Sequence, residues 1–207
     1  MISSTETQLH GYLLNEFGKD EPIITSDIKF EGCSRSCLYN AIRKLLKEGL
    51  VVRFCKGVYY LPTETMFGLS LLDSRKVVQR KYICSNSEVF GYYCGTALRH
   101  NVGLTTQVPN VLEIVTNNEK EDARESTIGT CRVITHSSKV KIDSQNVKVL
   151  EFLELMSTVS DINLDSQQKN KLCIYMKESG VSEAEILLYS SFFPPAAMKA
   201  FDAIGVP

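Results

Sequence analysis

The residues best suited to chemistry gather in the segment 34–56, where six basic side chains stand against a single acidic one. On a helical wheel, the stretch from Ser34 to Glu48 separates into two sides. One side is apolar and carries Leu38, Ala41, Ile42, Leu45 and Leu46. The other is polar and carries Ser36, Asn40, Arg43 and Lys47, with Tyr39 at its flank. Guanidinium and amide groups hydrogen-bond to base edges in the major groove of DNA. The pattern therefore predicts a helix that reads duplex DNA.

The residues that flank this helix extend the predicted contact surface. Ser34 and Arg35 open the helix, where backbone N–H groups and a cation favour phosphate. After Gly49 the chain is β-rich on both sides of the turn 55–57, which predicts a short hairpin. Its basic residues are expected to lie along the phosphate backbone or to enter the minor groove. The predicted DNA-binding set is Ser34, Arg35, Ser36, Tyr39, Asn40, Arg43, Lys47, Arg53 and Lys56.

The elements that must position these residues follow from the first 62 positions. We expect a first helix from Ser3 or Ser4 to Phe17, and a short second helix that begins at Thr25 or Ser26, carries Ile28 and is broken by Gly32. The helix of residues 34–48 and the hairpin follow. Three helices and then a hairpin is the order of a winged helix-turn-helix, so residues 1–62 are predicted to form such a DNA-binding domain. Residues 63–81 are predicted to be a basic connector that ends in a helix over 75–81.

The remainder, residues 82–207, is predicted to form a mixed α/β domain with a helical C-terminus, which makes the whole chain α+β. Strands are expected at 111–116 and 131–135, and 89–93 is either a strand or a helix start. The polar segment 117–127 is expected to be an exposed loop. Helices are expected at 96–101, 147–159, 166–179, 182–191 and 195–204.

Composition excludes several classes of protein. The 207 residues are 43% hydrophobic with a formal net charge of −1, which excludes a histone-like basic coat and a disordered polymer. The longest charge-free apolar stretch is too short for a membrane span of about 20 residues, and the start has no signal pattern. A cytoplasmic location is therefore expected. The seven scattered cysteines are expected to be reduced thiols rather than a disulfide framework.

Two blocks of sequence resemble a known family. The first is Ser-Arg-Ser-Cys-Leu-Tyr-Asn-Ala-Ile-Arg-Lys-Leu-Leu-Lys-Glu-Gly-Leu, followed by Lys-Gly-Val-Tyr-Tyr-Leu-Pro, within residues 34–62. The second, residues 95–117, carries Gly-Thr-Ala-Leu-Arg-His-Asn-Val-Gly-Leu and then Gln-Val-Pro before a strand. In this order they are similar to AbiEi-type bacterial antitoxins with an N-terminal winged helix. The resemblance covers about residues 1–135.

This resemblance implies two activities. The winged helix would repress its own operon by binding inverted repeats in double-stranded DNA. The C-terminal domain would counteract a nucleotidyltransferase-like toxin without forming a stable complex with it.

The sequence offers little else that could be a catalytic centre. None of the three histidines has a partner at metal-ligand spacing, and no phosphate-binding glycine loop is present. We therefore expect no enzymatic activity, no catalytic residues, no metal and no cofactor. Three alternatives stay open. They are a nuclease or transferase domain that uses Glu113 with the acids of 119–125 to hold magnesium, a winged helix used for protein contacts, and a repressor that senses thiol state through Cys37 or Cys55.

Overall fold

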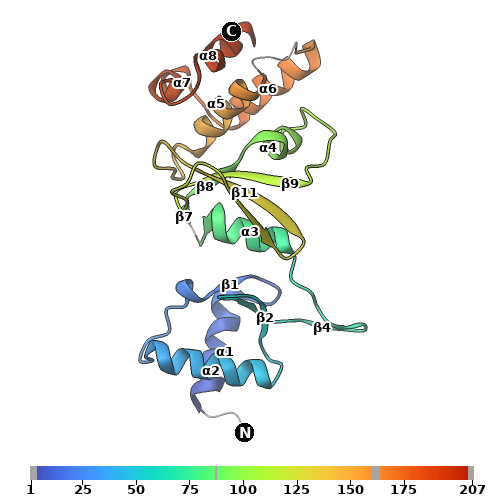
Figure 1. The fold of residues 1–207 in the computed structure, drawn as a ribbon, viewed down its shortest axis with the longest axis vertical. Helices are drawn as coiled ribbons and strands as arrows, with labels where there is room; N and C mark the ends of the chain where they lie inside the picture. The colour runs from blue at the N-terminus through green and yellow to red at the C-terminus, as the bar shows by residue number, and fades with distance from the viewer. Residues whose placement is uncertain (1–3, 87, 160–163, 205–207) are drawn as a thin grey trace. The chain divides into compact units, whose positions relative to one another are not determined.

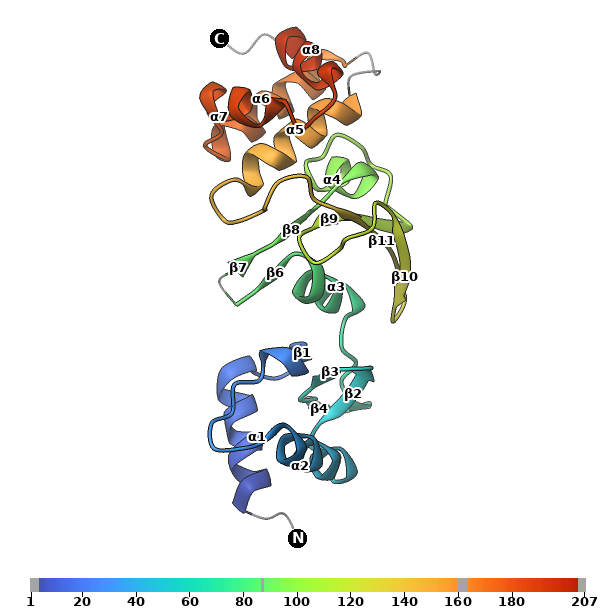
Figure 2. The same ribbon diagram turned by 60° about the vertical axis from the view of Figure 1, so that its left-hand side comes forward.

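The structure, a computed structural model, describes residues 4–86, 88–159 and 164–204. The chain divides into two compact units. Unit 1 contains the residues up to Lys81 and the turn Ile128–Thr130, and unit 2 contains Tyr82–Thr127 and the residues from Cys131 onward. The predicted connector 63–81 thus lies within unit 1. Taken together, the described residues form a mixed α+β structure (Figures 1 and 2).

Unit 1 begins with helices and a small sheet. Its elements are α1 (Ser4–Phe17), β1 (Ile23–Ile24), the 3-10 turn η1 (Thr25–Asp27), α2 (Arg35–Lys47), β2 (Val52–Cys55) and β3 (Val58–Tyr60). The sheet is antiparallel, in the order β1-β3-β2. Leu9 and Leu13 of α1 pack with the apolar side of α2 in one core, as Figure 1 shows for the two helices. The predicted first helix, the helix of residues 34–48 and the hairpin are confirmed.

The predicted second helix is wrong: only the single turn η1 forms between β1 and Gly32. Ile28 and Phe30 both pack against the core of unit 1. A spacing of two residues places them on one side of an extended segment, whereas a helix would turn them apart. The ring of Phe30 lies 5.5 Å from that of Tyr12, and the Tyr12 hydroxyl accepts a hydrogen bond from the backbone N–H of Lys29. These contacts hold the segment extended.

The rest of unit 1 is a second hairpin and a helix. β4 (Glu64–Thr65) pairs with β5 (Gly68–Leu69), and α3 (Ser74–Tyr82) matches the predicted basic helix. The tip of this hairpin exposes Met66 and Phe67 almost completely. Its base is tied to the end of α1, because Thr63 and Ser70 both donate hydrogen bonds to the Asp20 carboxylate.

Asp20→Asn is expected to lower the free energy of unfolding of unit 1 by about 1 kcal/mol at pH 7, because hydrogen bonds to a charged group are the stronger ones. The Ser70 and Thr63 hydrogen bonds hold the pKa of Asp20 below its usual 3.8. The stabilisation is therefore complete above about pH 4 and is lost as pH falls through the lowered value. Asparagine tolerates the positive φ of residue 20, so the substitution does not strain the backbone. Chemical denaturation should show a smaller difference in the free energy of unfolding between wild type and Asp20→Asn at pH 3 than at pH 7. An equal difference at both pH values, or an equal effect of the exposed control Asp202→Asn, would contradict this role.

Unit 2 begins with β6 (Cys84–Ser85) paired to β7 (Glu88–Val89), and its main sheet has the order β10-β11-β9-β8. The strands of this sheet are β8 (Gly91–Tyr93), β9 (Val111–Thr116), β10 (Arg124–Ile128) and β11 (Cys131–Ser137). β8 runs antiparallel to β9, whereas β11 runs parallel to it. The loop predicted over 117–127 is wrong in its last part, which is β10. Its charged residues occupy an edge strand, where Glu125 pairs with Arg132 of β11 at 2.6 Å.

Helices cover one face of this sheet and then form a bundle. α4 (Gly95–Asn101) contacts β9, and α5 (Val147–Val159) contacts β8 and α4. α5 also packs against α7 (Glu183–Ser190) and α8 (Pro195–Ile204), and α6 (Ser166–Glu178) packs against α8 (Figure 2). Eight residues of α5 are buried, so it is the centre of the bundle. The predicted helices of this region are confirmed, with ends within one residue. Among the described helices, none has both the length and the apolarity required to span a bilayer.

Candidate functional site

α2 presents one buried and one exposed side, as the wheel predicts. Leu38, Ala41, Ile42 and Leu45 are buried in the core of unit 1. The residues predicted to contact DNA are exposed, including the four on the hairpin and at the helix start. The exposed set is Ser34, Arg35, Ser36, Tyr39, Asn40, Arg43, Lys47, Arg53 and Lys56. Packing of the apolar side thus fixes the direction in which the polar side faces.

The start of α2 is set by its cap. The Ser34 side chain accepts a hydrogen bond from the backbone N–H of Cys37 at 3.2 Å. That contact occupies a lone pair of the Ser34 hydroxyl and orders the first turn. Arg35 follows at the first helical position with an exposed side chain.

The turn of the β2–β3 hairpin is anchored beside the start of α2. Thr25 of η1 donates two hydrogen bonds to the carbonyl oxygen of Gly57, from its hydroxyl at 2.9 Å and from its backbone N–H at 3.0 Å. Gly57 has a φ of +79°, which favours glycine at this position of the turn. Lys56 is thereby held, exposed, on a fixed turn.

These elements enclose a hollow of about 350 Å³ in unit 1. Its polar lining includes Thr25 and Ser26 of η1, Arg35 and Tyr39 of α2, and Lys56 of the turn. Three predicted residues, two from α2 and one from the hairpin turn, are thus brought together in one basic concavity. Ser36 and Asn40 instead border a second hollow on the other side of the α2 start, beside Lys44 and α1. Arg43 and Lys47 lie further along the same exposed side of α2.

The cations of this surface differ in whether they form an ion pair with an acidic side chain. Lys44 is neutralised, since its Nζ lies 2.7 Å from a carboxylate oxygen of the nearly buried Glu6. Within the described residues no ion pair involves the five other cations of the segment, which are Arg35, Arg43, Lys47, Arg53 and Lys56. On α3, by contrast, Lys76 pairs with Glu21 and Arg80 pairs with Asp27 at 3.2 Å. Two of the four cations of α3 thus have an acidic partner, whereas the five cations named on α2 and the β2–β3 hairpin take part in no ion pair of the described structure.

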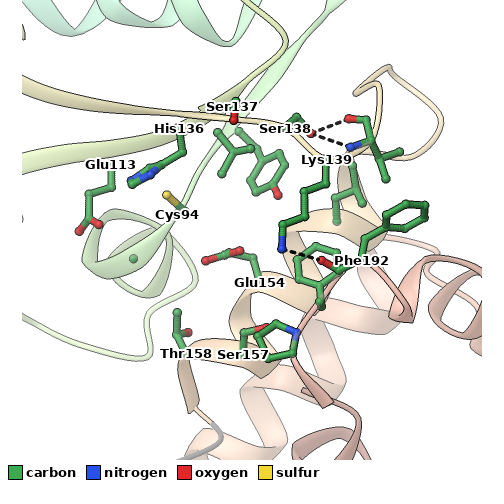
Figure 3. A pocket seen from close by; sticks show the side chains of 17 residues that line it. Cys94, Glu113, His136, Ser137, Ser138, Lys139, Glu154, Ser157, Thr158 and Phe192 are labelled. Carbon is green, nitrogen blue, oxygen red and sulfur yellow. Dashed lines mark hydrogen bonds between the residues drawn. The ribbon is translucent and has the colours of Figure 1, made fainter. Parts of the chain in front are cut away.

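A second group of reactive side chains lies in unit 2 and was not expected from the sequence. One ligand atom each from Cys94, Glu113 and His136 lies within 4.8 Å of the other two. All three line a cavity of about 410 Å³ together with Glu154 of α5 and Lys139. Figure 3 shows the His136 ring lying between the Cys94 sulfur and the Glu113 carboxylate, with Glu154 projecting from α5 toward them.

Sequence spacing does not reveal this group, because its members are 19 and 23 residues apart. The signal is in the strand pairing. Cys94 follows β8 and donates its backbone N–H to the Glu113 carbonyl oxygen at 2.9 Å, while His136 of β11 is paired with Val115 of β9. Only a correct sheet order would have placed the three side chains on one face.

The acidic loop does not join Glu113 in a magnesium site. Glu119 accepts a hydrogen bond from the Thr135 hydroxyl at 3.0 Å, and Glu125 is paired with Arg132. Within the described residues, the group of Cys94, Glu113 and His136 is the one that collects three potential ligands. The structure thus gives no support to the predicted alternative of a carboxylate cluster around Glu113.

Comparison with known proteins adds no homologue. No model of a known protein family matches the chain, and no significant match is found among curated proteins. DNA binding is therefore inferred from the geometry of the chain, and the biological role from the resemblance of its sequence blocks.

Proposed function

We propose that unit 1 is a winged helix-turn-helix that binds double-stranded DNA, with α2 in the major groove and the β2–β3 hairpin as the wing. The chain order α1–β1–η1–α2–β2–β3 supports this proposal, with the 3-10 turn in the place of the second helix. The sheet order β1-β3-β2 supports it too, because pairing with β1 anchors the hairpin next to the start of α2. An α-helix fits the width of the major groove, and a flanking hairpin reaches the backbone.

The observation that carries the proposal is the exposed polar side of α2, beside a basic concavity. Arg43 and Asn40 offer the bidentate groups that distinguish guanine and adenine. Arg35, Lys47, Arg53 and Lys56 offer cations without an acidic partner in the described structure. A helix face that only contacts solvent has no need of unpaired cations, and its cations could each be paired with an acidic side chain, as Lys44 is. The five unneutralised cations favour an anionic partner of extended shape.

The biological role that we propose follows from the resemblance to AbiEi-type antitoxins. The protein would bind inverted repeats at its own promoter as a transcriptional repressor. Inverted repeats require two copies of the DNA-binding unit, related by the symmetry of the operator. Unit 2 would supply the antitoxin activity against a nucleotidyltransferase-like toxin. Co-expression with the product of the adjacent reading frame tests that second role, since rescue of growth requires a toxic neighbour.

A gel-shift experiment tests DNA binding. A duplex is selected from a randomised pool by the full chain, and its affinity is compared with that of a scrambled duplex over a salt series. If about four cations per copy contact phosphates, the logarithm of affinity should fall with the logarithm of salt concentration with a slope of about −3.6 per copy. A helix used for protein contacts predicts no selection and no salt dependence. That result would remove the proposal.

Lys56→Ala is expected to weaken binding to the selected and scrambled duplexes by the same factor and to reduce the salt slope by about one unit. The reason is that a single phosphate contact carries no sequence information. The control is Lys199→Ala, which removes an exposed lysine from α8. A change in sequence preference, or an equal effect of the control, would show that the turn does not contact the backbone as proposed.

A further inference from the structure

We propose that Cys94, Glu113 and His136 of unit 2 form a binding site for a divalent transition metal ion, with zinc as the best match to the ligand set. The site lies outside the DNA-binding surface of unit 1 and does not depend on the function proposed for it.

The strand pairing places the three ligands on one face of the sheet. Tyr92 and His136 are both paired with Val115 of β9, and Glu113 lies two residues before Val115 on the same face. Cys94 continues β8 beside Glu113. The opposite face of β9 carries the buried Leu112, Ile114 and Thr116. The backbone pairing of β9 with β8 and β11 thus fixes the relative positions of the three ligand residues.

The chemistry of the ligands selects the class of metal. Thiolate, imidazole and carboxylate groups together suit zinc and related divalent transition metal ions, whereas magnesium and calcium take oxygen ligands. Metal–ligand distances of about 2.0–2.3 Å place tetrahedral ligand atoms roughly 3.3–3.8 Å apart. The observed limit of 4.8 Å is therefore about 1 Å wider than a filled site, a difference that side-chain rotation can close.

His136 is already oriented as a metal-binding histidine would be. Its Nδ1 lies 2.5 Å from the backbone carbonyl oxygen of Asp122. A carbonyl oxygen only accepts, so Nδ1 is the protonated nitrogen and donates this bond. In a neutral ring, Nε2 is then the nitrogen with the lone pair that a metal requires, and metal-bound histidines commonly donate their other ring N–H to such an acceptor.

The surroundings of Cys94 do not suit a free nucleophilic thiol. Cys94 is buried, and burial raises the pKa of its thiol, with smaller contributions from the charges of Glu154 and Glu113. A reactive cysteine needs a lowered pKa, which this environment opposes. A divalent ion reverses the balance, because it stabilises the thiolate and the carboxylates together. On binding, the Cys94 proton is released to the buffer.

The Glu113 carboxylate occupies space that a side chain at residue 95 would fill. A Cβ atom on Gly95 would lie 2.5 Å from Glu113 Oε1, and residue 95 has a φ of +56°. Glycine thus permits the carboxylate to lie against the backbone at the start of α4. Gly95→Ala should displace Glu113 without removing any ligand.

Three protein ligands leave one tetrahedral position open toward the cavity. Zinc sites that keep such a position bind water or a substrate there. Glu154 lines this cavity and projects toward the three ligand residues.

Cobalt substitution tests the site. The full chain, kept reduced by a phosphine, is titrated with Co²⁺ and then with Zn²⁺. We expect one Co²⁺ per chain, a thiolate-to-cobalt charge-transfer band, and displacement of cobalt by zinc. Cys94→Ser should remove the band. His136→Ala and Glu113→Gln should each weaken binding at least 100-fold, more than the loss of an outer-shell partner does.

Matched variants separate this site from other thiols. Cys131→Ser on β11, and Cys33→Ser, whose thiol lies beside Cys37 in unit 1, should retain the band and the affinity. Glu154→Gln should change the affinity by less than tenfold, because Glu154 is not one of the three ligands. Circular dichroism confirms that each variant is folded, and Glu113→Gln keeps the side-chain shape. Absence of stoichiometric binding, or equal loss in Cys131→Ser or Cys33→Ser, would overturn the assignment.

Discussion

Arg43→Glu is expected to weaken binding to the selected DNA duplex by about 3 kcal/mol or more, which is roughly 100-fold. Loss of a bidentate contact to a base costs about 1–3 kcal/mol. The new carboxylate adds repulsion from phosphates, and like-charge contacts at an interface cost several kcal/mol. Arg43 is exposed on α2, between the buried Ile42 and the ion-paired Lys44, so the substitution does not disturb the core. Gel shifts with selected and scrambled duplexes measure the loss.

Two variants separate charge from base recognition. Arg43→Lys keeps the charge but lacks the planar fork, so it should retain binding to the scrambled duplex and lose preference for the selected one. Lys199→Glu reverses an exposed charge on α8, which is not part of the proposed contact surface, and should leave both affinities within about twofold in 0.15 M salt. Equal losses in Arg43→Glu and Lys199→Glu would mean that overall charge, rather than α2, governs binding.

Phe152→Ala is expected to lower the free energy of unfolding of unit 2 by about 3–5 kcal/mol, the usual cost of removing a fully buried aromatic ring. The side chain has no exposed surface, and its ring meets that of Phe201 edge-to-face at 6.0 Å. Because α5 also carries Glu154, a loosened α5 should alter the cavity that contains Cys94 and His136. Chemical denaturation measures the free energy, and cobalt binding reports on the cavity.

Leu188→Ala serves as the control for this cavity-forming substitution. Leu188 lies on α7 with 66% of its surface exposed, so its truncation should cost less than about 0.5 kcal/mol. DNA affinity of folded Phe152→Ala should stay within twofold of wild type, since the core of unit 1 is composed of other residues. A loss of DNA binding equal to that of Arg43→Glu would show that the two units do not act separately.

The helices of unit 2 were predictable from spacing and caps. Residues 147–159 are helical over the predicted range, because their apolar side chains recur at helical spacing. Eight of the 13 residues of this helix are buried. Ser182 and Asp165 begin their helices through capping boxes in which a residue three positions on returns a hydrogen bond. Such signals involve neighbours in the chain, so tertiary structure is not needed to read them.

The sequence prediction is wrong for two elements that depend on contacts with another segment. The segment after Thr25 was expected to be helical, but packing of Phe30 against Tyr12 holds it extended. The charged residues of β10 resemble a loop locally, and they form a strand because β11 supplies the hydrogen bonds and Arg132 pairs with Glu125. In both places the deciding contact joins side chains of two different segments, which the periodicity within one segment does not register.

By itself, the sequence determined which residues of α2 would face water, since a helix of fixed period with one apolar stripe can bury only that stripe. It also determined the caps and the turn that hold Arg35 and Lys56 at the surface. Only the tertiary structure decided that Cys94, Glu113 and His136 meet in one cavity. The physical reason is that strand order and register, set by long-range backbone pairing, choose which distant side chains become neighbours.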